Sequence, residues 1–132
     1  MSVQLNHTIV WCRDQQASAS FLAETLGLPR PTRFGPFLVV EADNGVSLDY
    51  HEVDGVVTSQ HYAFLITEND FDEVFGRIVG HGREYWADPG LTQLGEINGN
   101  DGGRGVYFLD PDGHLLEILT RPYGSGVTEG GR

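Results

Sequence analysis

The chain has 132 residues, 39% hydrophobic and 11% aromatic, which is enough for one globular domain with its own core. Its net charge of −11 at pH 7 makes a surface that repels phosphate backbones and anionic lipid, which argues against binding of nucleic acid or a membrane surface. No apolar run approaches the roughly 20 residues of a membrane-spanning helix, and the single cysteine, Cys12, fits a reducing cytoplasm.

The first half of the chain carries the patterns of a strand, a capped helix and a two-stranded hairpin. These elements are expected, in that order, at residues 3–11, 14–27, 37–41 and 46–51. Asp14 is a helix-capping residue, and Gly27 is suited to close the same helix. Asn44-Gly45 is a strong signal for a tight hairpin turn between the last two strands.

The second half carries a strand, a helix and two further strands. They are expected at residues 61–67, 69–82, 106–109 and 114–121. Asn69 or Asp70 can cap the helix, and Asp110-Pro111-Asp112-Gly113 is a turn sequence. The Gly-rich segment 123–132 is expected to be a flexible tail.

The two halves repeat the same order of elements. When Gly45 is superposed on Gly113, a carboxylate falls four residues after the turn glycine in both halves, as Asp49 and as Glu117. Each module therefore begins with a histidine strand and ends with a carboxylate strand. Two such modules packed about a pseudo-twofold axis would bring these side chains toward one cavity.

His7, His61 and Glu117 are the candidate metal ligands, with Asp49, or His51 on the same strand face, as a fourth. Two imidazoles with one or two carboxylates suit Zn²⁺, Fe²⁺, Mn²⁺ or Ni²⁺ and leave positions open for substrate oxygens. Either histidine taken singly could be an ordinary core residue. Their relation through the repeat, and the apolar neighbours of Glu117, favour the ligand interpretation.

The second module contains an insertion. The histidines of the two modules are 54 positions apart (61 − 7), and the turn glycines are 68 apart (113 − 45), so the second module holds 14 more residues. The Gly-rich stretch from Pro89 to Arg104 is the obvious place for them. We expect it to cover the site and to present Asn98, Asp101 and Arg104, with a solvated connection as the alternative. Arg104 would pair with a substrate carboxylate or with an acidic group of the chain.

Three segments resemble the vicinal oxygen chelate superfamily, the group of glyoxalase I, extradiol dioxygenases, fosfomycin-resistance thiol transferases and metal-free bleomycin-binding proteins. The segments are Leu5-Asn6-His7, Gln60-His61-Tyr62-Ala63-Phe64 and Tyr107-Phe108-Leu109-Asp110-Pro111-Asp112-Gly113-His114-Leu115-Leu116-Glu117.

This resemblance implies an α+β fold of two paired βαβββ modules, about 3–53 and 60–122, that form an open curved sheet around a metal cavity within a single domain, 1–122. It also implies one divalent metal ion per chain and a homodimer that binds a small molecule.

The resemblance leaves the reaction open. A glyoxalase-like lyase or an extradiol-type dioxygenase is expected, with Glu117 and Tyr107 as catalytic candidates, although Tyr107 could equally be a packing residue. The alternative is a resistance protein that sequesters a bleomycin-type compound or transfers a thiol to fosfomycin. The thiol transferases carry a lysine shortly after the tryptophan of the second module, whereas Trp86 here precedes Ala87-Asp88-Pro89.

Overall fold

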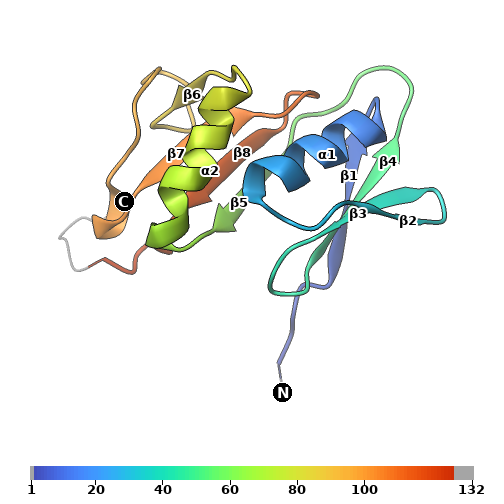
Figure 1. Cartoon of the computed structure of the whole chain (residues 1–132), viewed down its shortest axis with the longest axis horizontal. Coiled ribbons are helices and arrows are strands. Elements are labelled where there is room, and N and C mark those ends of the chain that lie inside the picture. Colours follow the sequence, from blue (N-terminus) through green and yellow to red (C-terminus); the bar gives the residue numbers. More distant parts are fainter. Residues whose placement is uncertain (1, 127–132) are drawn as a thin grey trace. The chain divides into compact units, whose positions relative to one another are not determined.

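The computed structural model describes residues 2–126 and divides the chain into two compact units (Figure 1). The first unit runs to Thr58 and includes Asp110–Asp112. The second unit comprises Ser59–Leu109 and the chain from Gly113 onward. The two units correspond to the two repeated modules.

The first unit is a four-stranded sheet with one helix. Its elements are β1 (His7–Cys12), α1 (Gln15–Leu26), β2 (Thr32–Phe34), β3 (Phe37–Glu41) and β4 (Ser47–Glu52). The strand order is β1-β4-β3-β2, with β1 parallel to β4 and the other pairs antiparallel. The first strand of the module therefore pairs directly with the last one.

The caps predicted for α1 are confirmed. The Asp14 carboxylate accepts a hydrogen bond from the backbone N–H of Ala17 at 3.1 Å, which satisfies one of the unpaired donors of the first turn. Gly27 closes the helix with a φ of 69°, a left-handed conformation that glycine adopts without a steric penalty.

The second unit repeats this plan. Its elements are β5 (His61–Leu65), α2 (Glu68–Gly80), β6 (Tyr85–Trp86), a 3₁₀ turn (Asn100–Gly102), β7 (Gly105–Leu109) and β8 (Leu115–Leu119). The strand order is β5-β8-β7-β6, with β5 parallel to β8. Both units therefore have the order βαβββ, and the strands of each sheet follow the same sequence.

The sheet registers confirm the superposition of the two halves. Ile9 lies opposite Asp49 in the first sheet, and Ala63 lies opposite Glu117 in the second. Each carboxylate thus sits across from the residue two places after the histidine of its module. The equivalence of Asp49 and Glu117 is a property of the fold as well as of the sequence.

Each sheet has a buried face and a face that carries the histidine. In β1, Val10 and Cys12 are buried, whereas His7, Ile9 and Trp11 are exposed on the other face. The period of two along a strand produces this alternation. In the second unit the helix side of the core is formed by Phe71, Val74, Ile78, Phe108, Leu116 and Ile118.

The structure corrects several element boundaries. Residues 3–6 precede β1 because Val3 and Leu5 are exposed and lie outside the sheet. The cap of α2 is Thr67, not Asn69 or Asp70, because its hydroxyl accepts the N–H of Asp70 at 3.2 Å. The short strands β2 and β6 were not predicted. In the described part of the chain, no helix has the length and apolar character needed to cross a membrane.

Candidate metal centre

Glu117 is the buried carboxylate of the second unit. Its side chain is 1% exposed, in the middle of β8, and its Oε1 lies 3.0 Å from Nε2 of His61. The imidazole belongs to β5, the neighbouring strand, and is 44% exposed. A carboxylate is costly to bury without a partner, and the parallel β5–β8 pairing supplies this one.

A chain of two tyrosines reaches the other oxygen of Glu117. The Tyr123 hydroxyl donates to Oε2, and the Tyr107 hydroxyl lies 2.6 Å from that of Tyr123. Tyr107 is buried and stands directly opposite Glu117 in the β7–β8 ladder. Burial, followed by the hydrogen bond to Glu117, raises the pKa of Tyr123, so its hydroxyl stays protonated at neutral pH.

The separation of the two donor atoms suits a shared metal ion. Two ligands at the 2.0–2.2 Å typical of nitrogen and oxygen on zinc-like ions, held at a right angle, lie about 3 Å apart. Nε2 of His61 and Oε1 of Glu117 lie 3.0 Å apart. These two side chains therefore fit neighbouring positions on one ion with little rearrangement.

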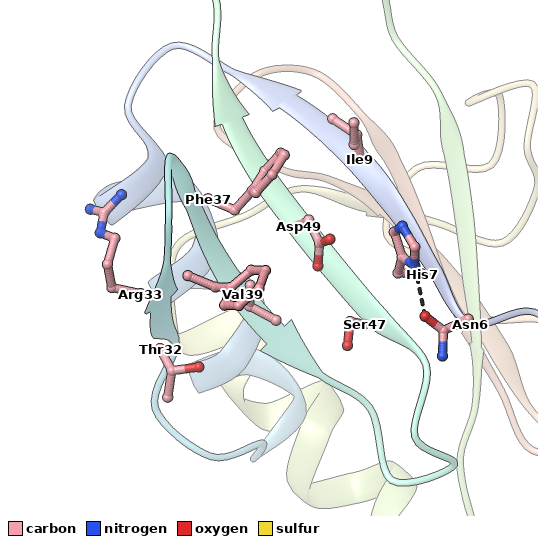
Figure 2. Close-up of a pocket in the computed structure, with 10 residues that line it drawn as sticks. Asn6, His7, Ile9, Thr32, Arg33, Phe37, Val39, Ser47 and Asp49 are labelled. Carbon is pink, nitrogen blue, oxygen red and sulfur yellow. Dashed lines mark hydrogen bonds between the residues drawn. The ribbon is translucent and has the colours of Figure 1, made fainter.

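The first unit places the other two candidates in one pocket. His7 is exposed at the start of β1, with Nδ1 2.7 Å from Oδ1 of Asn6. Asp49 is half-buried on β4, the strand next to β1 (Figure 2). The pocket has a volume of about 510 Å³ and is lined by Asn6, His7, Ile9, Thr32, Arg33, Phe34, Phe37, Val39, Ser47 and Asp49.

His51 is held by packing and does not line this pocket. Its ring stands 5.1 Å from that of Trp11 and 5.2 Å from that of Phe37, and its Nδ1 lies 2.9 Å from the backbone oxygen of Glu52. These contacts favour Asp49 over His51 as the fourth polar group beside His7.

The inserted loop is tied to the rest of the second unit by hydrogen bonds. The Asn98 side chain donates to the backbone oxygen of Ala87 at 2.9 Å, and the backbones of Asn98 and Gly105 form a β-bridge. Asp101 is buried and accepts the N–H of Gly126 at 3.1 Å. The loop is therefore built into the second unit at both ends and in its middle.

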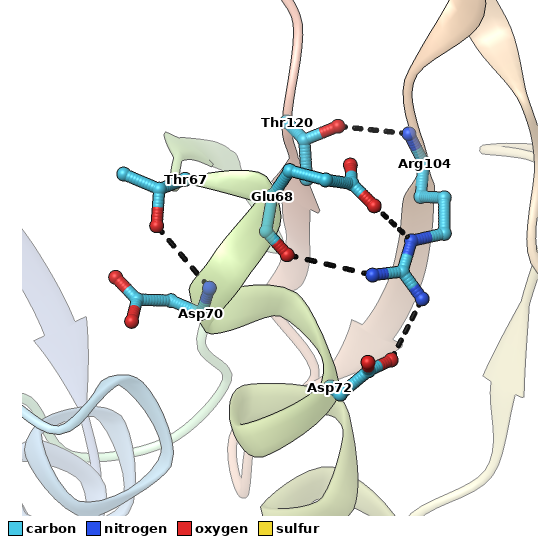
Figure 3. A network of polar contacts seen from close by, with 6 residues as sticks. All are labelled: Thr67, Glu68, Asp70, Asp72, Arg104 and Thr120. Carbon is cyan, nitrogen blue, oxygen red and sulfur yellow. Dashed lines mark hydrogen bonds and ion pairs between the residues drawn. The ribbon is translucent and has the colours of Figure 1, made fainter.

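Arg104 ends the loop on the surface of α2. Its guanidinium donates to Glu68 at 2.5 Å and to Asp72 at 2.7 Å (Figure 3). It also stacks 4.3 Å from the ring centre of Phe71. The ion pairs raise the pKa of Arg104, with the hydrogen bond to Asp72 as the largest cause. The sequence predicted that Arg104 would pair with either a substrate carboxylate or an acidic group of the chain. The structure shows the second kind of partner.

Tyr123 is the residue of this site that sequence reasoning missed. It lies six positions after Glu117, beyond the end of β8 and after Pro122, where strand periodicity no longer applies. The predicted flexible tail starts at Tyr123. Of this segment, Tyr123 and Gly126 make hydrogen bonds to Glu117 and Asp101, and residues 127–132 lie outside the described part of the chain.

The ligand candidates are divided between the units. Among the described residues, no three His, Cys, Asp or Glu side chains gather as a metal-binding group. The second unit contributes His61 and Glu117, and the first contributes His7 and Asp49.

Comparison with known proteins identifies the family. Residues 4–118 match the Glyoxalase/Bleomycin resistance protein/Dioxygenase superfamily, and the chain belongs to it. The duplicated βαβββ plan is the fold of this superfamily, as the resemblance of the sequence implied.

Particular relatives are of two kinds. The chain is 63% identical to the solved structure of the oxidase ChaP-H2, with a TM-score of 0.93, covering 96% of this chain and 99% of that one. It is 34% identical to the glutathione transferase FosA of Serratia marcescens in an alignment of 125 positions that covers 89% of this chain and 81% of the relative. The fosfomycin-resistance protein FosX of Mesorhizobium loti shares the fold at 20% identity and a TM-score of 0.70.

Proposed function

We propose that the protein is a metal-dependent oxidase that uses O₂ to oxidise a small aromatic molecule bearing two adjacent oxygens. His7, His61 and Glu117 would hold one divalent ion. The observation that carries this proposal is the 3.0 Å separation of His61 Nε2 and Glu117 Oε1, which suits two ligands of one ion. The similarity to an oxidase at 63% identity favours oxidation among the reactions of the superfamily.

Two histidines and one carboxylate are the ligand set of many non-haem iron oxygenases, so Fe²⁺ is the metal we propose. When bound, the ion supplies Lewis-acid and one-electron chemistry to a substrate that chelates it through adjacent oxygens. The residues of the chain supply the remaining functions, which are to bind the substrate, to orient Glu117 and to exclude water.

The pocket of the first unit is our candidate for the substrate site. Because His7 lines it, an ion on His7 would stand at its wall. Phe34, Phe37 and Val39 give the pocket an apolar wall suited to a flat ring, and Asp49 and Arg33 add polar groups of opposite charge (Figure 2). Such a mixture is typical of sites in which apolar contacts bind and a few polar groups orient the ligand.

We propose that the chain acts as a homodimer with an isologous interface. Ile9 is 39% exposed and Trp11 is 45% exposed on the histidine face of β1, and Leu65 is 62% exposed on β5. An apolar sheet face of this kind gains stability when a second copy covers it. Sedimentation as a monomer at micromolar concentration would contradict this assembly.

We also propose that the loop from Pro89 to Arg104 covers the bound substrate. Asn98 and Asp101 would shape the loop, Arg104 would anchor its end to α2, and Tyr107 on the following strand would contact the substrate. Replacement of the loop by a short Gly-Ser turn is expected to lower turnover tenfold or more, equivalent to about 1.4 kcal/mol of transition-state stabilisation. Unchanged turnover would remove the loop from the mechanism.

A thiol transfer to fosfomycin is the second candidate, because FosA is a relative at 34% identity. All eight basic residues of the chain are arginines, so the lysine expected for binding of the phosphonate has no counterpart. A glyoxalase-like reaction is the third, because Asp49 shares the pocket of His7 and occupies in the first sheet the position that Glu117 occupies in the second.

The test is an oxygen-electrode assay on protein prepared without metal and then reloaded with Fe²⁺. Catechols are the first substrates to screen. We expect O₂ uptake that requires both iron and substrate and that is lost in Glu117→Gln but kept in Glu84→Gln, an exposed glutamate of the same unit. Isomerisation of glutathione hemithioacetal, or addition of glutathione to fosfomycin, without O₂ uptake would overturn the proposal.

A further inference from the structure

The segment Pro122–Gly126, which we call the C-terminal strap, is fixed to the second unit at two points. The first is the Tyr123 hydroxyl, which donates to Glu117 and also contacts the Tyr107 hydroxyl. The second is Gly126, whose N–H donates to the carboxylate of Asp101 in the inserted loop. Arg121 adds a hydrogen bond from its guanidinium to the backbone oxygen of Ser125 at 3.0 Å.

The attachment of the strap at Gly126 leaves no room for a side chain on that residue. A Cβ on Gly126 would lie 2.6 Å from Cα of Asp101 and 2.8 Å from its carbonyl carbon and oxygen. These are backbone atoms, which cannot move aside cheaply. Asp101 itself adopts a φ of 57°, a left-handed conformation that persists only where surrounding contacts maintain it. The position of the strap is therefore closely specified.

The attachment of the strap at Tyr123 involves Glu117, the candidate metal ligand. Glu117 has two oxygens, and His61 lies beside Oε1, while the Tyr123 hydroxyl occupies Oε2. A carboxylate whose second oxygen accepts a hydrogen bond is held in one rotation and offers only its first oxygen to an ion. Tyr107, opposite Glu117 in the sheet, fixes the Tyr123 hydroxyl in turn.

We infer that Tyr123 is a positioning residue of the metal centre. It holds Glu117 as a one-oxygen ligand beside His61, and the contact of Gly126 with Asp101 sets the place of the strap that carries it. This inference rests on the proposed metal site and goes beyond it, because it assigns a function to a segment outside both βαβββ modules.

The first test compares the metal affinity of Tyr123→Phe with that of the wild type, by competition with a chelator for Co²⁺. Tyr123 is 37% exposed, so removal of its hydroxyl leaves the fold intact. We expect the Kd to rise by about 10–100-fold, the usual effect of losing a hydrogen bond to a metal ligand. Tyr85→Phe is the matched control, since its ring contacts Phe75 through its edge, and its Kd should equal that of the wild type.

The visible spectrum of the Co²⁺ protein gives a readout that a general loss of stability would not change. A Glu117 released from Tyr123 can bind through both oxygens, which increases the coordination number and lowers the intensity of the absorption bands. We expect this change in Tyr123→Phe and an unchanged spectrum in Tyr85→Phe. A Kd within twofold of the wild type, or a tighter one, would overturn the inference.

The second test displaces the strap from a distance. Gly126→Ala should raise the Kd in the wild-type background and have no further effect in Tyr123→Phe, because both changes act through one hydrogen bond. Gly76→Ala is the control, as a Cβ there meets no atom within 4 Å. Additive effects would show that the strap acts by another route. Failure of the wild type itself to bind Co²⁺ would instead overturn the proposed metal site, and the inference with it.

Discussion

Glu117→Gln separates the structural role of this side chain from its metal-binding role. The amide has the size of the carboxylate, its oxygen can still accept from Tyr123, and its NH₂ can face the imidazole of His61. We therefore expect the free energy of unfolding of the metal-free variant to lie within about 1 kcal/mol of the wild type, because the weaker hydrogen bonds of the amide are offset by removal of a buried charge. An amide is a much poorer ligand for a divalent ion, so metal binding should be lost.

The expected difference can be calculated. A ligand at 100 times its Kd stabilises the folded state by about 2.7 kcal/mol. Unfolding entropy of about 2.1 cal/mol/K per residue gives ~0.28 kcal/mol/K for a chain of 132 residues, so the wild type should melt about 10 °C higher with metal than without.

The assay is differential scanning calorimetry with and without Co²⁺. Glu117→Gln and His7→Ala should show no metal-dependent shift, and Glu84→Gln should keep the full shift. A retained shift in His7→Ala would refute the idea that both units contribute to one site.

Three further results are expected. Asp49→Ala should weaken metal binding about 10–100-fold if the carboxylate supports the site from the pocket, whereas His51→Ala should leave the Kd unchanged; the reverse pattern in the chelator assay would exchange their roles. Arg104→Ala should lower the melting temperature by an amount that shrinks in high salt and should not change KM, because the guanidinium is occupied by two exposed carboxylates; a raised KM would return Arg104 to the substrate. Burial, followed by the Asp112 carboxylate, raises the pKa of Cys12 to about 12, so the unfolded chain loses this proton first as the pH rises above 9. Stability should therefore be complete below pH 9 and fall by up to about 1.4 kcal/mol per pH unit toward pH 12. A Cys12→Ala variant with the same decline in a urea titration would refute this.

The sequence predicted the features that depend on periodicity and on repetition. The residue patterns predicted most of the strands and helices of each half, and the glycine superposition predicted that Asp49 and Glu117 would occupy equivalent positions in the two halves. Both follow from local rules, because side chains alternate along a strand and a hairpin turn fixes the pairing on either side of it.

The features that the sequence did not predict depend on tertiary contacts, which leave no local pattern of residues in the sequence. Nothing near Tyr123 indicates that its hydroxyl returns to Glu117, since β8 ends at Leu119 and the segment after it follows no period. The cap of α2 was misplaced because Thr67, Asn69 and Asp70 can each cap a helix, and only the geometry of the first turn selects Thr67. The short strand β6 forms because it pairs with β7, and this pairing depends on the tertiary structure more than on the local sequence.

The parallel pairing of the first and last strands of each module affects the order of events during synthesis. His7 pairs with Ser47, so the first module can close only when β4 has left the ribosome, and His61 pairs with Leu115, so the second must wait for β8. The 67 residues from Glu52 to Leu119 take about 3–13 s to synthesise at the usual rates of translation. Glu117 is the last of the candidate ligands to emerge. If the proposed site is right, a nascent chain that lacks β8 would offer an incoming ion only His7, Asp49 and His61, and capture of the metal would follow the emergence of Glu117.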